Sequence, residues 1–384
     1  MPTPAAAVRT PAEAVPIPTA TPAAAPVLPA SAAASVPVSP ASALATVPAD
    51  PGLPSAVVSV PSLDAALVAT ARSQHGMLST EQAIRAGISA PVLVKLVKAG
   101  VLRHPGRGLY AVSALVEPDA EAWHRQLCAG AFLLYPDAVL TGASALLAHG
   151  IPVWGVSLDA PCLLRPVKRA GGMAAFWVRP TRGEAVSTDW GPASPPASAL
   201  VQHAVDHGIV PGVVSADAAL RQGTVLLDEL TEQLEAVATW PHSSRAASML
   251  RLVDGRRESV GESRCGVALA MAGIDVTPQV PVLDERGNFV ARVDFLVDGT
   301  MVVVEFDGKV KYAAGDPTVL WDEKRREDRL RRLGYVVVRV TWAQLERPGA
   351  VAAAVRSALR PPDAGPGASQ HELSLRTTTE VVLR

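Results

Sequence analysis

Two acidic residues, Asp294 and Glu305, are joined by a stretch that predicts a β-hairpin. Apolar and more polar residues alternate before an Asp-Gly-Thr turn, and a β-branched run leads into Glu305. If Gly299-Thr300 is a two-residue turn, Asp294 pairs with Glu305. If the turn is centred on Asp298-Gly299, the two acids are diagonal neighbours. Either alternative brings the carboxylates close together, where a hard cation such as Mg²⁺ or Mn²⁺ would offset their repulsion.

This spacing, with lysines following at Lys309 and Lys311, resembles the core of the PD-(D/E)XK nuclease superfamily. It looks most like the branch related to very-short-patch-repair endonucleases. The resemblance implies that Asp294 and Glu305 are ligands of a catalytic Mg²⁺ or Mn²⁺ ion. It also implies Glu262, on a preceding helix, as a third acidic contributor to metal-assisted hydrolysis of DNA phosphodiesters.

The chain departs from the superfamily pattern at Asp307, which stands where a lysine is expected. Asp307 therefore becomes a further candidate metal ligand. The lysine role passes to Lys309 or Lys311, which share one face of the strand if it continues past Gly308. The alternative is a structural hairpin whose acids are solvated or paired with Arg292 and Lys309.

The elements that must position these residues lie within 246–360 and predict the order αβββαβα, which is that of a restriction-endonuclease-like domain. A helix at 259–272 carries Glu262, and a proline-containing edge strand at 277–283 precedes the hairpin. A charged helix at 322–333, a buried β-branched strand at 335–340 and a closing helix complete the unit. The charged helix could follow a phosphate backbone or be a salt-bridged solvent face.

Residues 61–114 predict three helices followed by a short hairpin, which is typical of a winged helix-turn-helix. Ser79 and Gln82 have the spacing of a capping box at the start of the second helix. Between 62 and 113 there are six Lys or Arg residues against two acidic ones. The candidate DNA-binding residues in this segment are Lys95, Lys98, Arg103 and Arg107.

The same segment, with QHGMLSTEQAIRAGIS at 74–89 and LVKAGVLRHPGRGLYAV at 96–112, resembles the DNA-binding domain of AbiEi-type antitoxins. The resemblance implies double-stranded DNA as a partner and a cognate toxin protein as a possible second one. A winged helix used only for protein interaction is the alternative.

Composition assigns no chemistry to the other regions. Residues 1–60 are rich in Ala and Pro, which predicts either a disordered tail or an over-extended gene start. Residues 361–384 are expected to form a flexible tail. The middle, 115–245, predicts a mixed α/β connecting region; His203 and His207 lie four apart but lack a third metal ligand. No apolar run is long enough for a membrane helix, and three widely spaced cysteines suit a reducing cytoplasm.

The sequence thus predicts an α/β protein that binds DNA and carries a metal-dependent endonuclease-like domain. One alternative is an antitoxin-like transcriptional regulator, in a toxin-antitoxin or phage-defence system, whose nuclease domain is degenerate. Asp307 at the lysine position favours that alternative. Another is an interaction protein without enzymatic activity. The oligomeric state is left open.

Overall fold

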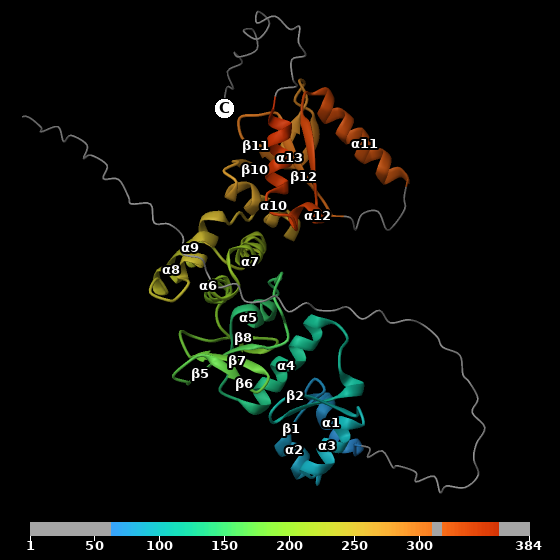
Figure 1. The fold of residues 1–384 in the computed structure, drawn as a ribbon, viewed down its shortest axis with the longest axis vertical. Helices are drawn as coiled ribbons and strands as arrows, with labels where there is room; N and C mark the ends of the chain where they lie inside the picture. The colour runs from blue at the N-terminus through green and yellow to red at the C-terminus, as the bar shows by residue number, and fades with distance from the viewer. Residues whose placement is uncertain (1–62, 309–316, 361–384) are drawn as a thin grey trace, which may run out of the picture. The chain divides into compact units, whose positions relative to one another are not determined.

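The computed structural model describes residues 63–308 and 317–360, and these form a mixed α/β structure with three β-sheets (Figure 1). The tails expected at 1–60 and 361–384 lie outside the described residues. Within the described part of the chain, no helix is long and apolar enough to cross a membrane.

The N-terminal module, residues 63–115, has three helices and a small antiparallel sheet with strand order β1-β3-β2. Its elements are α1 (Ala65–Ser73), β1 (Met77–Ser79), α2 (Thr80–Arg85), α3 (Ala90–Lys98), β2 (Leu102–Gly106), β3 (Leu109–Val112) and a 3-10 turn, η1 (Ser113–Leu115). The predicted capping box is confirmed: the Gln82 amide donates to the Ser79 hydroxyl at 3.2 Å, and the Ser79 amide donates to the Gln82 side chain at 2.9 Å. Strand β1 was not predicted, because three buried residues show no alternation.

The middle region is built around a six-stranded sheet of order β6-β7-β5-β4-β9-β8. Its elements are α4 (Ala120–Leu134), β4 (Val139–Leu140), α5 (Gly142–Ala148), β5 (Cys162–Arg165), β6 (Gly171–Met173), β7 (Phe176–Pro180), β8 (Val186–Thr188), β9 (Gly191–Ala193), α6 (Pro196–His207), α7 (Ile209–Gln222), α8 (Leu227–Ala236) and α9 (Ser243–Leu252). Helix α7 begins at Ile209, directly after the end of α6. Gly208, at a φ of +100°, ends α6 and allows the next helix to start at once.

The C-terminal module contains the predicted order αβββαβα, with one additional short helix, α12. Its elements are α10 (Val260–Met271), β10 (Val276–Leu283), β11 (Phe289–Val297), β12 (Val302–Asp307), α11 (Pro317–Arg332), β13 (Val336–Thr341), α12 (Trp342–Leu345) and α13 (Ala350–Leu359). The sheet order is β10-β11-β12-β13, antiparallel except for the parallel pair β12–β13. The proline-containing strand β10 lies at the edge, as predicted.

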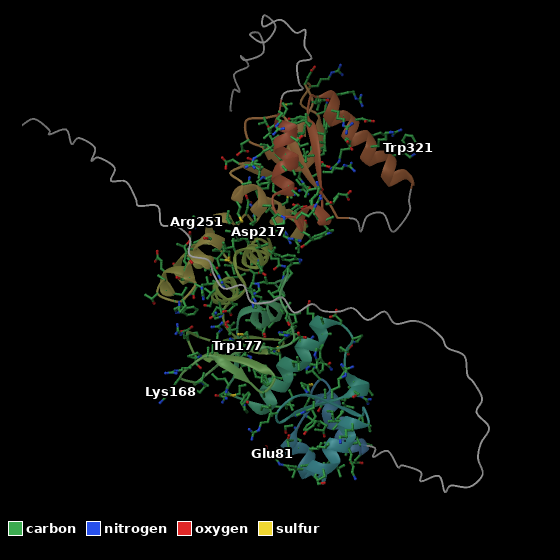
Figure 2. The ribbon with its side chains drawn as sticks, in the orientation of Figure 1. Glu81, Lys168, Trp177, Asp217, Arg251 and Trp321 are labelled. Atoms are coloured by element: carbon green, nitrogen blue, oxygen red, sulfur yellow. The ribbon has the colours of Figure 1, made fainter. Side chains whose placement is uncertain are left out.

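Helices cover both faces of this sheet, because neighbouring residues of β12 point to opposite sides. Val302 and Val304 belong to a core cluster with residues of α10 and α13, whereas Val303 packs in a second cluster with Leu330 of α11. Trp321 of α11 is 63% exposed (Figure 2).

Candidate functional site

The four predicted DNA-binding residues of the N-terminal module are all exposed. Lys95 and Lys98 lie on α3, while Arg103 and Arg107 lie on the β2–β3 hairpin. Helix α3 is anchored in the module by the buried side chains of Leu93 and Leu96, so its two lysines face outward.

The hairpin is constrained by contacts outside its own module. A Cβ atom on Gly106 would lie 2.6 Å from the backbone nitrogen of Ala175, so the β2 end of the hairpin packs directly against the β6–β7 connection. The Arg103 guanidinium lies 6.0 Å from the centroid of the Trp123 ring on α4. The hairpin is therefore held in place, and Arg107 at its tip is left exposed.

Strands β11 and β12 pair in the register that was expected for a turn at Gly299-Thr300. Phe295 pairs with Val304 and Leu296 with Val303. The connection is nevertheless longer than two residues, because the strands end at Val297 and Val302. Asp294 and Glu305 lie one step beyond the last ladder pair. There the Asp294 carboxylate accepts a hydrogen bond from the Phe306 amide at 2.7 Å, in place of a backbone carbonyl.

The pKa of Asp294 is raised to about 6. Burial is the largest cause, because it penalises the charged form. The negative charges of Glu262 and Glu305 raise the pKa further, whereas the Phe306 amide and the Arg326 guanidinium lower it. The structure therefore brings the three predicted carboxylates close enough for their charges to interact.

Glu262 is buried near the start of α10 and is held by several donors. It accepts hydrogen bonds from the Glu258 amide at 2.9 Å, the Ser259 hydroxyl at 2.8 Å and the Gln279 side-chain amide at 2.8 Å. Gln279 adopts a φ of +56° within β10, a left-handed conformation that costs of order 1–3 kcal/mol and is found preferentially at functional sites. Pro278 and Pro281, which lie on either side of Gln279, were the available sequence signal of an irregular strand.

Glu305 is 9% exposed and forms an ion pair of 2.8 Å with Arg326 of α11. Carboxylate oxygens are the donors that Mg²⁺ and Mn²⁺ prefer, so the residue types fit such an ion. Among the described residues, however, no group of three or more His, Cys, Asp or Glu side chains is placed to hold a metal. Among the described residues, the Arg326 guanidinium is a cation that faces Glu305.

The remaining predicted residues lie at the end of β12. Asp307 is its last residue, is half-buried and pairs with Thr341 of β13. Lys309 and Lys311 fall outside the described residues. On α11, which was expected either to follow a phosphate backbone or to be salt-bridged, Glu327 contacts both Arg331 and Arg339. The described contacts favour the salt-bridged alternative.

A comparison with known families finds a match within the N-terminal module. Residues 66–113 match the family described as "Transcriptional regulator, AbiEi antitoxin". A comparison with curated proteins gives no match. Among solved structures, the RV2827C protein from Mycobacterium tuberculosis is similar at 18% identity and a TM-score of 0.32, over 57% of this chain and 87% of that one. A likeness of this size supports no inference.

Proposed function

We propose that the chain binds double-stranded DNA through a winged helix formed by its N-terminal module and acts as a transcriptional regulator of the antitoxin type. The match of residues 66–113 to the AbiEi antitoxin family carries this proposal. A cognate toxin protein is then a second expected partner, and the site of action is the cytoplasm, where the DNA is.

In this proposal α3 is the recognition helix. Its exposed Lys95 and Lys98 contact phosphates beside the major groove, and the exposed Val94 between the helix's buried residues supplies apolar contact to bases. The β2–β3 hairpin acts as the wing, with Arg107 free to reach a neighbouring phosphate. The contact of Gly106 with the β6–β7 connection sets the orientation of this wing.

The test measures binding of the full chain to a DNA fragment from upstream of its own gene, by fluorescence anisotropy over a range of salt concentrations. Lys95→Ala/Lys98→Ala should weaken binding at least tenfold and reduce the salt dependence by roughly two phosphate contacts. The matched control is Arg251→Ala/Arg286→Ala, which removes two exposed charges elsewhere. Equal losses in both double variants, or no binding by the wild type, would contradict the proposal.

A second candidate function is metal-dependent cleavage of DNA by the C-terminal module. The observation that favours it is the clustering of Asp294, Glu305 and Glu262 next to the strained Gln279. Asp294 and Glu305 would hold Mg²⁺ or Mn²⁺, which when bound would polarise the scissile phosphate. Glu305 would first have to exchange its ion pair with Arg326.

The ion pair between Glu305 and Arg326 also supports the alternative that the site is degenerate, since the guanidinium supplies the positive charge that a metal would bring. Incubation with supercoiled plasmid and Mg²⁺ or Mn²⁺ distinguishes the two. Cleavage that is lost in both Asp294→Ala and Glu305→Ala supports the enzyme. Intact plasmid with either ion, under conditions in which the protein binds its DNA fragment, supports a regulator with an inactive nuclease domain.

A further inference from the structure

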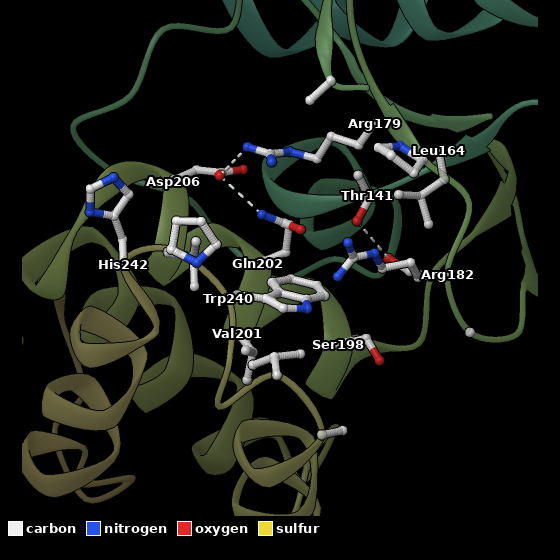
Figure 3. Close-up of a pocket in the computed structure, with 18 of the residues that line it drawn as sticks. Thr141, Leu164, Arg179, Arg182, Ser198, Val201, Gln202, Asp206, Trp240 and His242 are labelled. Atoms are coloured by element: carbon white, nitrogen blue, oxygen red, sulfur yellow. Dashed lines mark hydrogen bonds and ion pairs between the residues drawn. The ribbon is translucent and has the colours of Figure 1, made fainter. Parts of the chain in front are cut away.

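The middle region contains a cavity of about 1010 Å³ that the sequence did not predict (Figure 3). It lies between the sheet and the helices packed on it: β7 contributes Arg179, α6 contributes Gln202, and the segment from α8 to α9 contributes Trp240. All its walls come from residues 141–245, so the cavity is separate from the carboxylates of the C-terminal module.

The cavity is strongly cationic. Among its lining side chains, five carry a positive charge and one carries a carboxylate, although the whole chain has 35 Lys and Arg against 36 Asp and Glu. The five are Lys168, Arg169, Arg179, Arg182 and Arg245. Like charges gathered in one concavity repel each other, so a ligand that brings negative charge would relieve that repulsion.

The single carboxylate, Asp206, does not neutralise this wall. It is shared between the Arg179 guanidinium and the Gln202 amide, which donates at 3.0 Å. Burial raises its pKa. The Nε atom of Arg179 is buried and has no hydrogen-bond partner among the described residues. One guanidinium nitrogen of the wall is therefore left without a hydrogen-bond partner among the described residues.

The floor of the cavity adds an aromatic ring. The Arg182 guanidinium lies 4.6 Å from the centroid of the Trp240 ring, and Figure 3 shows this indole among the lining side chains. Ser198 donates to Gln233 at 2.7 Å, and both residues line the same cavity as Trp240, so the cavity also holds neutral hydrogen-bonding groups. Indole rings bind the faces of nucleobases by stacking, and hydroxyl and amide groups can pair with base or ribose edges.

We propose that this cavity binds a nucleoside di- or triphosphate. The planar guanidinium group of arginine has paired N–H donors that match the geometry of phosphate oxygens, and four of the five cations are arginines. The phosphates lie against Arg179 and Lys168, and the base lies against Trp240 beside Ser198 and Gln233. The volume is at the upper end of the roughly 300–1,000 Å³ of small-molecule sites, which leaves room for one nucleotide with its phosphates.

The test is isothermal titration calorimetry of the full chain with ATP, GTP and inorganic phosphate, in which we expect one of the nucleotides to bind. Lys168→Ala should weaken nucleotide binding at least tenfold, because it removes a charged partner of phosphate. Arg182→Ala should also weaken nucleotide binding, because it removes the guanidinium that lies over the Trp240 ring beside the base. Both side chains are exposed, so neither substitution leaves a buried polar group without its partner. Arg251→Ala is the control, since Arg251 is an exposed arginine of α9 outside the cavity; Figure 2 labels Lys168 and Arg251.

Trp240→Phe and Trp240→Ala separate stacking from charge. Phenylalanine should retain most of the affinity and alanine should lose it, with thermal melts verifying that both variants fold. Four results would overturn the proposal: no binding of either nucleotide at millimolar concentration, equal binding by the cavity variants and the control, binding of a single-stranded oligonucleotide without binding of mononucleotides, or binding of an acidic peptide alone.

Discussion

Replacing Asp294 by asparagine should stabilise the protein at neutral pH, although Asp294 is a candidate functional residue. The folded structure raises the pKa of its carboxyl from 3.8 to about 6, mainly through burial. At 1.36 kcal/mol per pKa unit, keeping this group ionised costs the folded state up to about 3 kcal/mol. Asparagine removes the charge, and its side-chain oxygen can still accept from the Phe306 amide. We expect a gain of about 1–3 kcal/mol, or about 2–4 °C in Tm per kcal/mol.

The pH dependence follows from the direction of the shift. Because the folded-state pKa lies above the unfolded value, the wild type is penalised progressively as the pH rises from 3.8 to about 6, and the penalty is constant above that. The advantage of Asp294→Asn should therefore be complete at pH 7.5 and fall to about one third at pH 4.5.

Thermal melts of the wild type and Asp294→Asn at pH 4.5 and 7.5 check this prediction. Asp275→Asn is the matched control, because Asp275 is an exposed aspartate of the same module and the change in charge is the same. A lower Tm for Asp294→Asn at pH 7.5, or an equal gain at both pH values, would refute the reasoning that burial penalises this carboxylate.

Three further predictions concern packing and buried charge. Gly106→Val should lower the free energy of unfolding by about 1–3 kcal/mol in urea titrations, because the valine side chain would clash with the Ala175 backbone. An unchanged unfolding midpoint would show that the backbone at Ala175 moves away without a loss of stability. Arg257→Ala should cost about 3–5 kcal/mol in the same assay, because it leaves the buried Asp217 carboxylate without the guanidinium 3.0 Å away; a loss below 1 kcal/mol would argue against a buried pair. Burial lowers the pKa of His203 from 6.5 to about 3, so the wild type should lose stability as the pH falls below 6.5, and melts of His203→Gln should show a smaller loss; equal slopes would contradict this assignment.

Local signals in the sequence were sufficient for several elements. The capping box at Ser79 and the order of elements in the C-terminal module were predicted, and the register of β11 and β12 is one of the two alternatives that the sequence left open. Each depends on residues close together in the chain, where caps, turns and hydrophobic periodicity act directly. The match of residues 66–113 to a family of transcriptional regulators agrees with the prediction made from the same segment.

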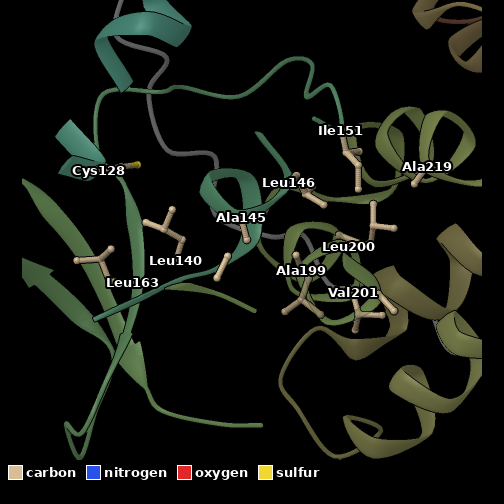
Figure 4. Packing of buried hydrophobic residues seen from close by; sticks show 14 of the residues in the cluster. Cys128, Leu140, Ala145, Leu146, Ile151, Leu163, Ala199, Leu200, Val201 and Ala219 are labelled. Atoms are coloured by element: carbon tan, nitrogen blue, oxygen red, sulfur yellow. The ribbon is translucent and has the colours of Figure 1, made fainter. Parts of the chain in front are cut away.

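The middle region was predicted poorly, because its structure depends on residues that lie far apart in the chain. All six strands of its sheet have only two to five residues, too few for periodicity to be visible. Its core is assembled from small and aliphatic residues far apart in the chain, such as Leu140 and Leu163 of the sheet and Leu200 of α6 (Figure 4). The cationic cavity is a product of the same assembly.

The amino-acid sequence by itself determined which residues could do chemistry and which local elements carry them. Only the tertiary structure decided their partners: Arg326 faces Glu305, the strained Gln279 holds Glu262, and arginines from separate segments line one cavity. The first of these contacts joins side chains 21 residues apart and the second joins side chains 17 residues apart. They form only when packing of the apolar core brings distant segments together, and no local pattern in the chain records that distance.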